Sequence, residues 1–146
     1  MKPVSSILSA LFLSALSTLA MDRFDALSQI ESQGNDRAIG PQGEVSRYQI
    51  LPEVWTRIWH KLANVTLRPT DPATAKIAAN WIMQPRCIAF ESRYHRAPTD
   101  FEFYILWHRP ACYIGRAVPR AITTVEAGRA NRFANLCQRP EAFAAH

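Results

Sequence analysis

The stretch LSQIESQGNDRAIGPQGEVSRYQILPEVW, residues 27–55, decides how the rest of the chain is organised. Phe24, Leu27 and Glu31 lie three and four residues apart and therefore share one face of a helix. Gly34 suits the position just past a helix C-terminus, which places Glu31 in the last turn, where the negative end of the helix dipole opposes a carboxylate. Because apolar packing and this dipole both favour the neutral acid, we expect Glu31 to have a raised pKa.

Start and stop signals divide the remainder of the chain into helices. Asp71 followed by Pro72 indicates a helix N-terminus, and Thr99 with Glu102 indicates a capping box at another. Pro85 lies inside the helix that Asp71 opens, and we expect it to kink or divide that helix. No stretch alternates with period two, and none repeats another. The sequence predicts an all-α single domain, with at most a minor β-hairpin in the loop 37–50. The expected helices span about 22–33, 52–62, 72–94, 101–109 and 119–137.

Apolar stripes at helical spacing mark the expected core. The inward residues of the last helix are expected to be Ile122, Val125, Ala130, Phe133 and Leu136. Three tryptophans with apolar neighbours are expected in the core and not on a sugar-binding platform: Trp55, Trp59 and Trp81. The cysteines are expected to be small buried hydrophobes with one disulfide at most, because their spacing matches no metal motif: Cys87, Cys112 and Cys137.

The composition is that of one globular domain with a cationic excess. Of the 146 residues, 48% are hydrophobic and 20% charged, which excludes a disordered chain. The net charge of +5 comes almost wholly from arginine and suits a polyanionic partner such as a cell-wall polymer, a membrane surface or nucleic acid. Scattered arginines without a dense run make nucleic acid the weakest of these candidates, and we expect no nucleic-acid partner.

The N-terminus resembles an export signal. Lys2 precedes an uncharged segment that ends in Thr18-Leu19-Ala20, a suitable cleavage site after Ala20. We therefore expect a signal peptide at 1–20, a mature domain at 21–146, and a location in the periplasm or outside the cell. The alternatives are an uncleaved leader, which would be the chain's only link to a membrane, and a true start at Met21.

The sequence ESQGN at 31–35, followed by a glycine-bearing loop and YQI at 48–50, resembles the catalytic core of the soluble lytic transglycosylases and goose-type lysozymes. In that family a Glu-Ser pair ends the first catalytic helix, and a Gly-Leu-Met-Gln turn follows. Glu31 and Ser32 match the pair, and Gln49 matches the end of the turn. The resemblance implies a lysozyme-like domain that cleaves peptidoglycan, without a cofactor or metal, as a monomer. It makes Glu31 the catalytic residue, with Ser32 and Gln49 near the sugar.

Two elements depart from the family pattern. Ser46-Arg47-Tyr48 stands where the family has Gly-Leu-Met, so Tyr48 would replace a methionine beside the sugar. The family's late Tyr-Asn turn has its best counterpart at 105–110, where Trp107 and His108 occupy those two places. An aromatic ring can stack on a sugar and an imidazole can donate a hydrogen bond, so both are expected in the cleft wall.

The family mechanism uses one glutamate twice, as acid and then as base, and gives 1,6-anhydro products by cleaving the β-1,4 bond between N-acetylmuramic acid and N-acetylglucosamine. Hydrolysis would instead need a second carboxylate, for which Glu44 is the best candidate. Transglycosylation is preferred because none of the nearby acids is convincing in that role. Two other classes stay open: a non-catalytic envelope protein that binds glycan, and an exported protein whose loop 34–48 docks a partner.

Overall fold

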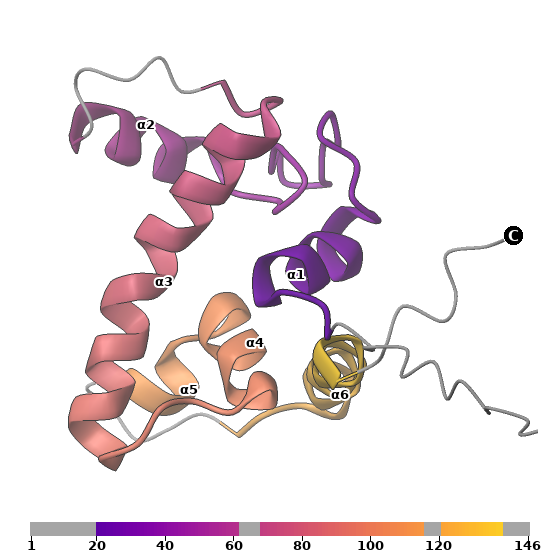
Figure 1. Ribbon diagram of the computed structural model, residues 1–146. Coiled ribbons are helices and arrows are strands. Elements are labelled where there is room, and N and C mark those ends of the chain that lie inside the picture. The colour runs from indigo at the N-terminus through magenta and orange to yellow at the C-terminus, as the bar shows by residue number, and fades with distance from the viewer. Residues whose placement is uncertain (1–19, 62–67, 116–120, 139–146) are drawn as a thin grey trace, which may run out of the picture.

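The computed structural model describes residues 20–61, 68–115 and 121–138, and these form a helical domain (Figure 1). The helices are α1 (Arg23–Ser32), α2 (Pro52–Lys61), α3 (Pro72–Tyr94), α4 (Asp100–His108), α5 (Ala111–Ile114) and α6 (Thr124–Gln138). The all-α prediction is confirmed. Strand-like pairing in the loop 37–50 consists of isolated bridges that join Val45 to Ile39 and to Ile50. The expected signal peptide lies outside the described residues except for Ala20.

The long helix α3 runs along one side of the molecule, with α2 beside its N-terminal part and α5 beside its C-terminal part (Figure 1). Asp71 caps α3 as predicted, because its side chain accepts the N–H of Thr74 at 2.8 Å. The helix continues through Pro85, so the expected division is wrong. Buried side chains on both sides of Pro85, among them Met83 and Phe90, hold the two halves against the same core.

Helices α4 and α6 both begin with a capping box. Thr99 and Glu102 form the predicted capping box, with the Thr99 N–H donating to Glu102 Oε2 at 2.8 Å. Thr123 and Glu126 repeat it at α6, where the Thr123 N–H donates to Glu126 Oε2 at 2.8 Å. This second box sets the first helical residue at 124, later than the sequence suggested.

The core lies between α4, α6, α1 and α3, and α4 packs on both α6 and α3. Its largest fully buried side chains include Tyr104, Phe90, Phe133, Leu27 and Ile58. No helix within the described ranges is long and apolar enough to cross a bilayer.

Several packing expectations fail at the edges of this core. Trp55 is 5% exposed as predicted, whereas Trp59 and Trp81 are 51% and 37% exposed, because α2 and α3 bury only the faces that meet the rest of the domain. Val125 is 71% exposed, since α6 begins only one residue before it and the inward face starts at Glu126. Cys112 and Cys137 are buried as expected, whereas Cys87 is only half-buried, and all three are free thiols.

Candidate active site

Helix α1 ends where the sequence predicts, and this end positions Glu31. Gln33 forms the C-cap with φ of 58°, and Gly34 follows at C′ with φ of 77°. Their N–H groups donate to Gln29 O at 3.1 Å and Ser28 O at 3.0 Å, which satisfies the last carbonyls of the helix. Two consecutive left-handed residues turn the chain away, so Glu31 lies in the final turn of α1.

The Glu31 carboxyl group is half-buried and hydrogen-bonded. The Tyr104 hydroxyl donates to Glu31 Oε1 at 3.1 Å. Burial raises the pKa of Glu31 above its ordinary value, and the negative charge of Glu44 adds to the rise. The Tyr104 hydrogen bond and the positive charge of Arg129 act in the opposite direction without cancelling it. The raised pKa that we expected from the sequence is therefore found, with desolvation as its main cause.

The Glu31 side chain lines an open cavity of about 510 Å³, whose other lining residues come from the loop 41–51, α2, α3, α4, Pro110 and α6. Three other residues expected at the site line the same cavity: Gln49, Trp107 and His108. Burial lowers the pKa of His108, and the charge of Arg129 lowers it further, so the imidazole is neutral near pH 7. The cavity therefore combines an acid of raised pKa, an indole ring, a neutral imidazole and a side-chain amide.

A strained turn presents Gln49 to the cavity. Val45 and Ile50 close the turn with a reciprocal pair of backbone hydrogen bonds at 2.9 and 3.0 Å. Within it, Ser46 and Gln49 have a left-handed backbone, with φ of 73° and 50°. The side-chain amide nitrogen of Gln49 donates to Ser46 O at 3.0 Å. Non-glycine residues rarely hold this conformation unless the surroundings enforce it. The turn thus fixes the backbone beside the acid.

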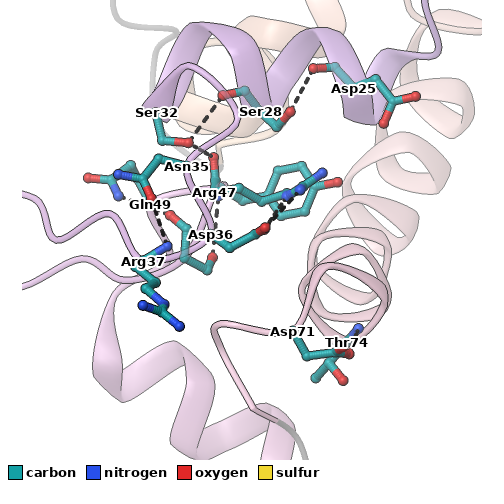
Figure 2. A network of polar contacts seen from close by, with 12 residues as sticks. Asp25, Ser28, Ser32, Asn35, Asp36, Arg37, Arg47, Gln49, Asp71 and Thr74 are labelled. Atoms are coloured by element: carbon teal, nitrogen blue, oxygen red, sulfur yellow. Dashed lines mark hydrogen bonds and ion pairs between the residues drawn. The ribbon is translucent and has the colours of Figure 1, made fainter.

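Ser32 and Tyr48 lie outside the cavity, contrary to our expectation for sugar-contacting residues. The Ser32 hydroxyl donates to Arg47 O at 2.8 Å and fastens the end of α1 to the turn (Figure 2). The Arg47 guanidinium in turn pairs with Asp36 at 2.5 Å. Tyr48 is fully buried, with its ring edge-on to Phe24, and burial raises its pKa to about 12. A fully buried ring cannot contact a sugar. Tyr48 instead packs edge-on against Trp107, a residue of the cavity wall, with ring centroids 6.4 Å apart.

Three residues of the site were missed by sequence reasoning: Tyr104, Arg86 and Arg129. Tyr104 is separated from Glu31 by 73 residues, and its ring stacks on His108 at 6.2 Å. Its place four residues before His108 on one helix was a usable signal, because such residues share a face. Arg86 and Arg129 come from α3 and α6 and line the cavity. Nothing in their local sequence distinguishes them from the other arginines.

No family model, curated protein or solved structure matches this chain. A functional assignment therefore rests on the site itself.

Proposed function

We propose that this protein cleaves peptidoglycan as a lytic transglycosylase, with Glu31 as its single acid and base. The observation that carries the proposal is the placement of Glu31. A carboxyl group of raised pKa, half-buried at a helix end, faces a cavity of about 510 Å³ that also holds an indole, an imidazole and an amide. An acid kept protonated near its working pH is what the departure of a sugar oxygen requires.

The reaction uses Glu31 twice, first as an acid and then as a base. The neutral acid protonates the oxygen between N-acetylmuramic acid and N-acetylglucosamine, and the bond from that oxygen to the muramoyl C1 breaks. The Glu31 carboxylate then takes the proton of the muramoyl 6-hydroxyl, whose oxygen attacks C1 and closes a 1,6-anhydro ring. The glutamic acid is restored and no water is consumed. Tyr104, hydrogen-bonded to Glu31 Oε1, stabilises the intermediate carboxylate.

The backbone of the 45–50 turn supports this proposal. Ser46 stands where the resembled family has the glycine of its Gly-Leu-Met-Gln turn, and Ser46 has φ of 73°, a conformation that glycine adopts most easily. Gln49, which matches the glutamine of that turn, lines the cavity with Glu31. In the proposed complex Gln49 and His108 hydrogen-bond the sugars, and Trp107 stacks on one of them.

One observation favours a second candidate, a hydrolytic lysozyme. Glu44 lines the same cavity as Glu31, and its charge contributes to the raised pKa of Glu31. A second carboxylate within reach of the substrate could activate water. However, Glu44 Oε2 already accepts the N–H of Gln42 at 2.8 Å, which ties it to its own loop. We therefore place transglycosylation first.

The test is digestion of isolated cell walls by the purified protein. Wild type and Glu91→Gln, which makes the same chemical change on an exposed side of α3, should release soluble fragments, and Glu31→Gln should release none. Mass spectrometry decides the reaction, because an anhydro product is lighter by one water than a hydrolysed one. Hydrolysed products lost in Glu44→Gln would establish the lysozyme. Wall binding without release by any variant would establish a non-catalytic glycan-binding protein.

The leader and the cationic surface suit this activity. Export through residues 1–20 would bring the chain to the periplasm or cell exterior, where peptidoglycan lies, and a net charge of +5 would attract it to an anionic wall.

A further inference from the structure

Two arginines, Arg86 and Arg129, line the cavity. Arg23, Arg47, Arg96 and Arg109 each form an ion pair with an aspartate or glutamate. Arg86 and Arg129 form none with any residue of the described ranges, although both line the cavity.

Arg86 is fixed in place by the end of α4. One of its terminal nitrogens donates to Leu106 O at 2.9 Å and Trp107 O at 2.7 Å. These carbonyls compensate part of its charge, because they form the negative end of the helix dipole. Burial nevertheless lowers the pKa of Arg86, and the nearby charge of Arg57 lowers it further. An anion entering the cavity would relieve this cost.

Arg129 lies on α6 and is exposed at the cavity rim. Its positive charge lowers the pKa of Glu31 and that of His108, which places it within electrostatic reach of the proposed acid. Among the described residues it forms no ion pair, and it lies close to the Tyr104 hydroxyl, so several of its five N–H donors can still serve a ligand. A guanidinium can bind a carboxylate through two parallel hydrogen bonds.

We propose that Arg129 and Arg86 form an anion subsite that binds a carboxylate carried by the sugar beside the cleaved bond. The inference rests on the proposed function and names its substrate class. N-acetylmuramic acid differs from N-acetylglucosamine by a lactyl ether that ends in a carboxyl group. This group is a free carboxylate on glycan strands without stem peptides and an amide where a peptide is attached. The preferred substrate is therefore a glycan strand stripped of its peptides.

Binding of three matched sugars to the full chain tests the subsite. The probes are N-acetylmuramic acid, its neutral methyl ester, and N-acetylglucosamine, and binding is followed by calorimetry and by intrinsic tryptophan fluorescence, to which Trp107 in the cavity wall contributes. Wild type should bind the free acid about tenfold more tightly than the ester, since a charge-assisted pair is worth about one decade in affinity. This preference should weaken as salt concentration rises.

Variants assign the preference to the arginine. Arg129→Gln should bind the acid and the ester equally, and Arg129→Lys should keep part of the preference because it keeps the charge. Arg132→Gln removes an exposed arginine of the same helix that does not line the cavity, and it should behave as wild type. Equal affinity of wild type for all three sugars would overturn the inference, as would a preference that survives in Arg129→Gln.

Cleavage assays separate this inference from the proposed function. Release of fragments from intact and peptide-stripped walls at equal rates, with no preference among the three sugars, would overturn the subsite and leave the glycosidase. A preference for the acid that depends on Arg129, with no fragments released from either wall, would uphold the subsite and refute the enzyme.

Discussion

The Tyr104 hydroxyl donates a hydrogen bond to Glu31 Oε1 at 3.1 Å and so joins the middle of α4 to the last turn of α1. Tyr104 is fully buried, and its pKa is raised by burial and by the adjacent Glu31. The Tyr104 hydroxyl therefore stays protonated, and remains a hydrogen-bond donor, near neutral pH. Glu31, the acid of the proposed reaction, thus accepts a hydrogen bond from the Tyr104 hydroxyl, and this bond favours the ionised form of Glu31.

Removal of this donor should raise the pKa of Glu31 further. In Tyr104→Phe the ring still fills the core, but the carboxylate loses its hydrogen bond, so the neutral acid is favoured. The high-pH limb of the rate profile for wall cleavage should move to higher pH, and the free energy of unfolding should fall by about 1 kcal/mol. Tyr94→Phe, which removes an exposed hydroxyl on α3, is the control. An unchanged pH limb in Tyr104→Phe would contradict the assignment.

Burial of Glu31 should make the protein less stable as pH rises. Since the pKa of Glu31 is higher in the folded than in the unfolded state, the folded state binds the proton more tightly, and this contribution disappears as pH rises through the folded pKa. Glu31→Gln should therefore gain stability relative to wild type as pH rises from 4.5, the ordinary glutamate value, through the raised pKa of the folded state. Urea unfolding of both proteins across this range measures the difference. A difference independent of pH would show that Glu31 is not buried in solution.

Local signals predicted the helix ends, and they did so for physical reasons. A cap such as Asp71 or Thr99 satisfies backbone N–H groups within three residues of itself, so the sequence alone contains both partners. The same is true of Gly34, whose left-handed backbone ends α1. The same local interactions are sufficient to predict that Glu31 lies in the last turn of a helix.

Contacts between distant helices were not predictable in this way. The partnership of Glu31 with Tyr104, and the approach of Arg129, depend on how α1, α4 and α6 pack, which no short spacing encodes. The wrong prediction of a buried Trp59 has the same cause. Helical periodicity identifies an apolar stripe, but it does not show how much of that stripe a neighbouring helix covers. Tertiary packing likewise keeps α3 continuous through Pro85.

Substitutions at Ser46 should report the strain of the turn beside the site. Its φ of 73° suits glycine, is tolerated by serine and is costly for a β-branched residue. Ser46→Gly relieves the strain but loses the hydrogen bond that the Ser46 hydroxyl accepts from the Tyr48 N–H at 3.3 Å, so it should cost no more than about 1 kcal/mol. Ser46→Val should lose about 2 kcal/mol or more and should reduce wall cleavage by displacing Gln49. Equal stability of the two variants, measured by urea unfolding, would show that the turn is not held in this conformation.

The ends of the Glu44 and Gln49 side chains both lie against Gly40, so Gly40→Ala should disturb the site without unfolding the protein. A Cβ atom there would collide with the ends of both side chains, which are flexible and can move away. Stability should therefore change by less than about 1 kcal/mol, while affinity for the glycan falls as Gln49 leaves its position. The matched control is Gly128→Ala, a helical glycine of α6 whose Cβ would meet no neighbouring atom, and it should stabilise by about 1 kcal/mol with unchanged affinity. If Gly40→Ala bound glycan as well as Gly128→Ala does, Gln49 would have no part in substrate binding.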